Sequence, residues 1–174
     1  GYMAQDTALP NSVSYATPIL GGTVATVNVQ ASEAAGLGTN VNLSAVHRSG
    51  PLLLAVAGGR VKHAPSPDPA GAQDERFVMI GGSYDLQVVR LFAQYTDHKD
   101  GLANLKTKTP HIGLTAPVGT GQIQLAWAES KTSGAASSKR TTTSAGYVHP
   151  LSKRTELYVM VANDRVPVGT AQSY

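Results

Sequence analysis

Residues 111–128 read HIGLTAPVGTGQIQLAWA, and this stretch decides the fold class. It contains two runs, 111–118 and 122–128, in which apolar and polar residues alternate with a period of two. Alternation of this kind places the apolar side chains on one face of a β-strand and the polar ones on the other. The break between the runs, 119–121, is Gly-Thr-Gly, which is typical of a tight turn between antiparallel strands. We therefore predict a β-hairpin here.

The same pattern recurs along the whole chain, whereas no segment shows the three- and four-residue apolar spacing of a helix. Ten strands are expected, near residues 12–18, 23–32, 40–48, 52–61, 76–84, 87–96, 109–118, 121–130, 141–149 and 155–163. Short connections alternate with long ones, which are expected at residues 33–39, 62–75, 97–109 and 130–139. Alternating short and long connections describe an antiparallel up-and-down sheet. The predicted fold class is all-β with few or no helices.

The composition excludes several classes of protein. The hydrophobic share of 41% is too high for a disordered chain, and no run approaches the roughly 18 apolar residues of a spanning helix. A formal net charge of +3 with scattered cations gives no indication of nucleic-acid binding. The absence of cysteine excludes disulfides, thiolate nucleophiles and cysteine-ligated zinc.

Two architectures use such a sheet: a soluble β-sandwich and a membrane β-barrel. The polar face of the predicted strands carries Thr, Asn, Gln, Ser and Gly instead of the Lys and Glu usual on a solvated sandwich, which favours a barrel with a wet lumen. Six aromatic residues fall near predicted strand ends, where an interfacial girdle or simple packing of turns would place them. They are Tyr15, Tyr84, Tyr95, Trp127, Tyr147 and Tyr158.

Four segments carry a resemblance to a known family. They are NSVSYATPILGG (11–22), SYDLQVVRLFAQY (83–95), APVGTGQIQLAWA (116–128) and GYVHPLSKRTELY (146–158), the last with a Leu-Ser-Lys-Arg-Thr turn at 151–155. The chain resembles the general trimeric porins of Gram-negative outer membranes, of the betaproteobacterial type. Pro150 departs from the family pattern and is expected at a strand end.

The resemblance implies a transmembrane barrel of about sixteen strands, of which this chain would hold ten consecutive middle-to-late strands. Residues 1–174 would be a single partial barrel domain, with residues 1–10 as the possible tail of the inward-folded loop that narrows the pore. Early strands and the final strand are missing from the pattern. The resemblance also implies location in the Gram-negative outer membrane.

The predicted strand faces assign side chains to pore and lipid. The expected pore-lining residues are Arg90, Gln94, Gln122, Gln124, Asn28 and Arg48. Arg48 is equally well explained as a solvated residue at the periplasmic rim. The expected lipid-facing residues are Val89, Leu91, Tyr95, Leu125 and Trp127. Arg60 and Lys62 are expected at the outer edge of the apolar band. The remaining cations considered are expected in or beside long loops: Lys106, Lys108, Lys131, Lys139 and Arg140.

Nothing in the sequence favours catalysis. The five histidines lack metal-ligand spacing, and neither a GxSxG elbow nor a phosphate-binding loop is present. We therefore expect no catalytic residues, no metal and no cofactor.

The leading hypothesis is a passive diffusion channel for small hydrophilic solutes and ions, mildly anion-preferring. Its expected partners are outer-membrane lipid and lipopolysaccharide, hydrophilic solutes and anions, and two further copies in a homotrimer if the full-length barrel is present; nucleic acid is not expected. The alternatives are a truncated or non-conducting barrel serving as a surface or structural module, and a soluble ligand-binding β-sandwich.

Overall fold

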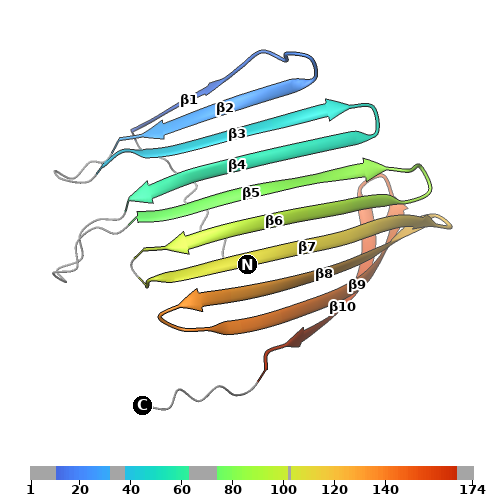
Figure 1. Cartoon of the computed structure of the whole chain (residues 1–174). Coiled ribbons are helices and arrows are strands. Elements are labelled where there is room, and N and C mark those ends of the chain that lie inside the picture. Colours follow the sequence, from blue (N-terminus) through green and yellow to red (C-terminus); the bar gives the residue numbers. More distant parts are fainter. Residues whose placement is uncertain (1–10, 32–37, 63–73, 102, 168–174) are drawn as a thin grey trace.

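The computed structural model describes residues 11–31, 38–62, 74–101 and 103–167, which form one ten-stranded sheet (Figure 1). Each strand pairs antiparallel with the next, in sequence order from β1 to β10. The strands are β1 (Ser12–Ala16), β2 (Thr23–Gln30), β3 (Asn40–Ser49), β4 (Leu52–Lys62), β5 (Asp74–Asp85), β6 (Arg90–Asp100), β7 (Leu105–Val118), β8 (Gly121–Gly134), β9 (Ser138–Ser152) and β10 (Thr155–Arg165). The predicted all-β, up-and-down class is confirmed.

Connections of two kinds lie at the two ends of the strands. Short connections at one end, here named the turn edge, join β1–β2, β3–β4, β5–β6, β7–β8 and β9–β10. The opposite end, the loop edge, carries the other four connections, of which 31–39 and 63–73 are the longest (Figure 1). The expected loop tail at residues 1–10 lies outside the described residues, as do most of these two long connections.

No helix occurs in the described part of the chain, and so none there is long and apolar enough to cross a membrane.

The turn between β5 and β6 lies further along the chain than predicted. Gln87 has a φ of 69°, its N–H donates to the Asp85 carboxylate at 2.8 Å, and the Leu86 N–H donates to the Val89 carbonyl at 2.9 Å. An Asp side chain that accepts a hydrogen bond from the backbone two residues on stabilises a turn. Residues 86–89 therefore form the connection, and the prediction that Val89 lies within a strand was wrong.

Strands β7, β8 and β9 extend further toward the loop edge than predicted. Segments 105–108, 131–134 and 138–140 were expected in loops because they are polar, but they belong to the sheet. Hydroxyls across β7 and β8 bond to one another, Thr107 to Thr132 and Thr109 to Ser130, both at 3.0 Å. The hydroxyl groups thus form hydrogen bonds with one another across the two strands. Polar side chains alone therefore do not end the strands.

The sheet has no hydrophobic core. Among the described residues no hydrophobic side chain is buried. A β-sandwich would cover the apolar face with a second sheet, and the described residues form a single one. The exposed apolar face therefore needs an apolar medium outside the described sheet.

Candidate functional site

The register divides every strand into two faces, because directly opposed residues in an antiparallel pair lie on the same side of the sheet. One face, here named the polar face, can be followed through two series of directly opposed residues on neighbouring strands: Ser14–Asn28–Asn42–Gly59 and Gln94–His111–Ala128–Thr142. The other, the apolar face, is traced by Val27–Leu43–Gly58–Val78 and Leu91–Leu114–Leu125–Ala145–Val161. One consistent assignment runs through all ten strands.

The middle of the polar face is neutral and hydrogen-bonding. Gln94 stands opposite Gly81 and His111, and Gln124 stands opposite Thr115 and Gly146. Glycine opposite each glutamine leaves the amide uncrowded. Such a surface can hydrate passing solutes without holding an ion strongly.

The amides at β2 and β3 continue this face. The Asn28 Nδ2 donates to the Ser14 hydroxyl at 2.5 Å, and Asn42 lies directly opposite Asn28. Gly59, opposite Asn42, has no room for a side chain, because a Cβ there would clash with the Asn42 amide and with the Phe77 ring. Phe77 on the polar face of β5 was not singled out from the sequence, because an aromatic residue in an alternating strand gives no signal of its packing.

Charged groups on the polar face lie toward the strand ends and are mostly paired. Arg90, the first residue of β6, donates to the Asp85 carboxylate at 2.6 Å at the turn edge. At the loop edge Arg140 pairs with Asp164, which also accepts from the Thr142 hydroxyl. Arg90 is thus on the polar face, as its neighbours in the sequence suggested, but at the rim and not near the middle of its strand.

Arg48 is the cation of this face that lacks an acidic partner among the described residues. It is exposed, lies one residue from the turn-edge end of β3, and stands opposite Leu53. Its backbone N–H donates to the Gly22 carbonyl at 2.8 Å, which fixes the main chain beneath it. The structure thus places it on the polar face, close to the turn edge.

Gln122 also lies on this face near the turn edge, opposite Pro117 and Val148. With it, all six expected pore-lining residues share the polar face, spread over β2, β3, β6 and β8. A hollow of about 330 Å³ near the centre is lined by Phe92, His111, Gln124 and Met160 among others. Met160 was missed from the sequence because its strand carries a long apolar run, which hides the alternation.

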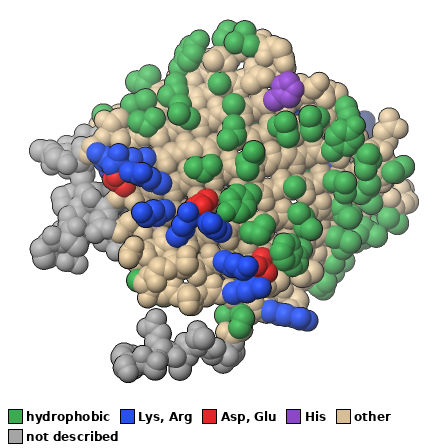
Figure 2. Space-filling model, viewed as in Figure 1, with side chains coloured by type: hydrophobic (Ala, Val, Ile, Leu, Met, Phe, Trp, Pro, Cys, Tyr) green, Lys and Arg blue, Asp and Glu red, His purple; other side chains and the backbone are tan. Residues whose placement is uncertain are grey.

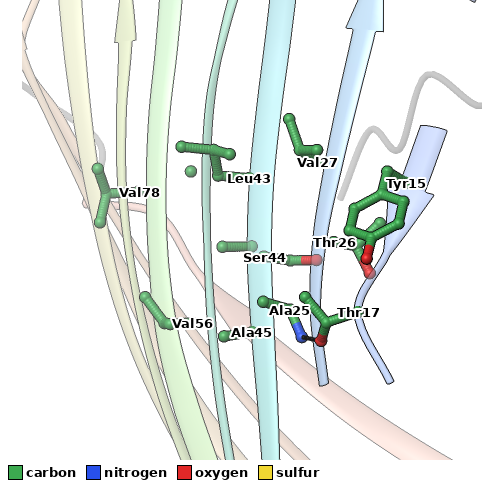
Figure 3. Close-up of a pocket in the computed structure, with 12 residues that line it drawn as sticks. Tyr15, Thr17, Ala25, Thr26, Val27, Leu43, Ser44, Ala45, Val56 and Val78 are labelled. Carbon is green, nitrogen blue, oxygen red and sulfur yellow. Dashed lines mark hydrogen bonds between the residues drawn. The ribbon is translucent and has the colours of Figure 1, made fainter. Parts of the chain in front are cut away.

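The apolar face carries four of the five residues expected to face lipid: Leu91, Tyr95, Leu125 and Trp127. Figure 2 shows this face, with hydrophobic side chains spread over most strands. A groove of about 380 Å³ lies over β1–β5, where Tyr15, Leu43 and Val78 surround the small side chains of Ala25 and Ala45 (Figure 3). The apolar surface is therefore broad and uneven.

The aromatic residues do not form one ring. Tyr84 lies on the apolar face beside the turn edge, whereas Tyr95 and Trp127 precede the first charged residues toward the loop edge, Asp97 and Glu129. Tyr158 lies on the polar face, opposite Val148. The apolar band is thus bounded by aromatic groups on β5, β6 and β8.

Beyond the band, toward the loop edge, the apolar face becomes strongly charged (Figure 2). Arg60 and Lys62 lie there at the end of β4, as expected from their shared face with Leu54. The lysines expected in loops, Lys106, Lys108, Lys131 and Lys139, are strand residues of this charged zone. Arg140, expected with them, lies on the polar face.

The described residues contain no group of three or more His, Asp or Glu side chains that could hold a metal ion.

Comparisons with known proteins agree with this architecture. Residues 1–167 match the Gram-negative porin family. The chain belongs to this family. It is 32% identical over 160 residues to outer membrane porin protein 32 of Delftia acidovorans, covering 85% of this chain and 44% of that protein. This porin chain is accordingly placed in the Gram-negative outer membrane.

Solved porin structures show the same fold. The anion-selective porin from Comamonas acidovorans superposes with a TM-score of 0.77 at 30% identity, over 89% of this chain and 48% of that one. The trimer form of OmpT from Vibrio cholerae gives a TM-score of 0.68 at 11% identity, over 89% of this chain and 54% of that one, and shows the fold alone. The chain spans about half the length of the relatives it matches.

Proposed function

We propose that the chain forms part of the wall of a water-filled channel through which small hydrophilic solutes and ions cross the outer membrane. The observation that carries this is the continuous separation of the two faces over ten strands, with no hydrophobic side chain buried among the described residues. A sheet with this separation is stable when its apolar face meets lipid and its polar face meets water. Inside a bilayer every backbone N–H and C=O group of the protein must be hydrogen-bonded. The edge strands β1 and β10 therefore have to pair with further strands to close the barrel.

The apolar face contacts outer-membrane lipid and lipopolysaccharide in this proposal. Closure of the barrel calls for strands beyond those described, and the complete barrel assembles as a homotrimer, as the general porins it resembles do. Gln94, Gln124 and Asn28 form the neutral lining, and Arg48 and Arg90 lie at its periplasmic rim.

We propose a mild preference for anions. The Comamonas acidovorans relative is anion-selective. In this chain the support comes from Arg48, because Arg90 and Arg140 are paired with carboxylates. The neutral middle of the polar face keeps the preference weak, since a field that biases ions needs unpaired charge along the low-dielectric wall.

Planar-bilayer recording of the native protein tests both the proposed channel and its proposed preference for anions. The protein should conduct, and Arg48→Gln should shift the reversal potential in a salt gradient toward cations. The control is Lys108→Gln, which removes the same charge from the apolar face. This variant should leave the reversal potential unchanged. Correct membrane insertion without conductance would contradict the channel and favour the structural module, and equal shifts in the two variants would contradict the assignment of faces.

A further inference from the structure

A gap between side chains lies over Gly113, near the middle of β7 on the polar face. Gly113 stands opposite Phe92 on β6 and opposite Ala126 on β8. His111 and Thr115 are its neighbours on the same face of β7, because residues two apart in a strand share a face. Gly113 has no side chain, so these four residues surround a floor of bare backbone. All five line the hollow of about 330 Å³ on this face.

The spacing of the sheet sets the size of the gap. Phe92 and Ala126 lie two strands apart, which is roughly 10 Å across the sheet at about 4.8 Å per strand. His111 and Thr115 lie four residues apart, which is roughly 13 Å along β7 at about 3.3 Å per residue. A gap of these dimensions admits one flat ring system inserted beside Phe92.

Two walls of the hollow are apolar, on a face whose middle is otherwise neutral and hydrogen-bonding. The Phe92 side chain is 39% exposed and makes no ring contact with another described residue. Met160 on β10 extends over Gly146 of β9, since a Cβ at this glycine would lie 3.8 Å from both the Cγ and the Cε of Met160. An exposed aromatic ring and a polarisable thioether at one hollow favour an aromatic partner, because both groups attract π systems.

A third wall is the amide of Gln124, whose hydrogen-bonding edge is unused. Gln124 on β8 stands opposite Thr115 on one side and Gly146 on the other. No other described residue forms a hydrogen bond with its side chain or with the His111 ring. A primary amide offers a donor N–H beside an acceptor C=O. It therefore pairs with a ligand edge that carries an acceptor beside a donor, as glutamine does with N7 and the 6-amino group of adenine.

The charge around the hollow favours an uncharged ring over an ion. None of the described residues that line it is Lys, Arg, Asp or Glu. Arg90, two residues before Phe92 on the same face, is neutralised by Asp85 at 2.6 Å. An ion in the hollow would lose water without gaining an opposite charge, which is costly.

We propose that this hollow binds adenine-type bases, which are uncharged heteroaromatic rings with an amino group beside a ring nitrogen. The face of the ring contacts Phe92 and Met160, and the amino edge pairs with the Gln124 amide. This inference rests on the proposed channel, because the hollow lies on the face proposed to line the lumen. It names a class of solute that the channel wall holds during passage.

The test is the dissociation constant of adenine for the native protein in detergent, measured by ligand-observed saturation-transfer NMR. This measurement does not require a conducting channel. Phe92→Ala should weaken adenine binding at least five-fold, because an aromatic side chain contributes strongly to holding a stacked base. The matched control is Phe77→Ala, the same change on the polar face of β5 but outside the hollow. The control should bind adenine like the native protein.

A second pair of variants tests the amide. Gln124→Leu keeps the bulk of the side chain and should also weaken adenine binding at least five-fold, because the paired edge is lost. The control is Gln94→Leu. Gln94 lies over Gly81 on the far side of β6, since a Cβ at Gly81 would lie 3.3 Å from the Gln94 Cβ. This control should leave adenine binding unchanged.

Three outcomes would overturn the proposal. Equal losses in a variant and its control would show that the hollow is not the site. Equal affinity for adenine and 6-methylpurine, which has a methyl group in place of the amino group, would refute the pairing with Gln124. Tighter binding of benzoate than of adenine would refute the choice of an uncharged ring.

Conductance is recorded on the same preparations, so that the site and the channel fail separately. A protein that conducts but does not bind adenine overturns the site and leaves the channel in place. A protein that binds adenine through Phe92 and Gln124 but does not conduct overturns the channel alone.

Discussion

A single substitution on β8 tests whether the apolar face meets the hydrocarbon of a bilayer. Leu125 lies four residues from Gly121, where the strand begins, and four residues from Glu129, the first charged residue on its apolar face. Leu114 and Ala145 stand opposite it on either side, and its side chain is 44% exposed in the sheet. Leu125 is therefore at the middle of the apolar band, and Leu125→Arg would place a guanidinium near the bilayer midplane.

The expected cost follows from this depth. An arginine on the lipid face of a barrel costs about 2–4 kcal/mol at the midplane and close to nothing at the interfaces. Because about 1.4 kcal/mol is a factor of ten in an equilibrium constant, the folding equilibrium should fall roughly thirty- to seven-hundred-fold. The neighbouring Gln124→Arg points to the polar face, opposite Thr115 and Gly146. It should leave the free energy of unfolding nearly unchanged.

The assay is reversible urea unfolding of the native protein from lipid vesicles, followed by tryptophan fluorescence, with Leu125→Ala as a control for lost apolar contact. A destabilisation by Leu125→Arg well beyond that of Leu125→Ala supports the lipid-facing assignment. Equal free energies of unfolding for Leu125→Arg and Gln124→Arg would refute it.

Two other substitutions address the turn edge. Asp85→Asn should shift the reversal potential toward anions, because the amide can still accept the Gln87 N–H while Arg90 loses its carboxylate partner at 2.6 Å; a shift toward cations would contradict the placement of this pair in the lumen. Gly50→Val should lower the free energy of unfolding by about 1–2 kcal/mol, because Gly50 has a φ of 54° and left-handed backbone is costly for residues other than Gly, Asn and Asp. Gly50→Asn should cost less, and equal unfolding midpoints for the two variants would show that the turn does not hold this conformation.

The ten strands could be predicted because each combines an alternating pattern with turn residues at one end. The face of each residue within a strand follows from parity alone, which is why the sequence could predict that Gln94 and Gln124 share the face opposite to that of Leu125. The error at Val89 arose because residues 86–96 contain no Gly or Pro that would mark the turn. The turn there is set by the side-chain hydrogen bond from Asp85, which a pattern of hydrophobicity does not contain.

The ion pairs could not be predicted from the sequence for a related reason. Arg90 was singled out as a lumen charge, but its partner Asp85 is fixed by the register of two strands and not by sequence distance. The place of Lys106, Lys108, Lys131 and Lys139 in the charged zone of the apolar face was likewise missed, because they come from strand segments that resemble polar loops. Their alignment across neighbouring strands follows only from the register of the sheet.

The same register changes what the net charge of the chain means. Nine of its fourteen Lys and Arg residues lie on the apolar face: Arg60, Lys62, Arg76, Lys99, Lys106, Lys108, Lys131, Lys139 and Arg165. Only Arg48, Arg90 and Arg140 lie on the polar face, and Arg90 and Arg140 are paired there with Asp85 and Asp164. Most of the basic charge behind the formal +3 therefore lies on the apolar face and outside the proposed channel. Because residues of the two faces differ only by parity, moving one cation by a single residue along a strand would transfer it from the face proposed to meet the membrane to the face proposed to line the channel.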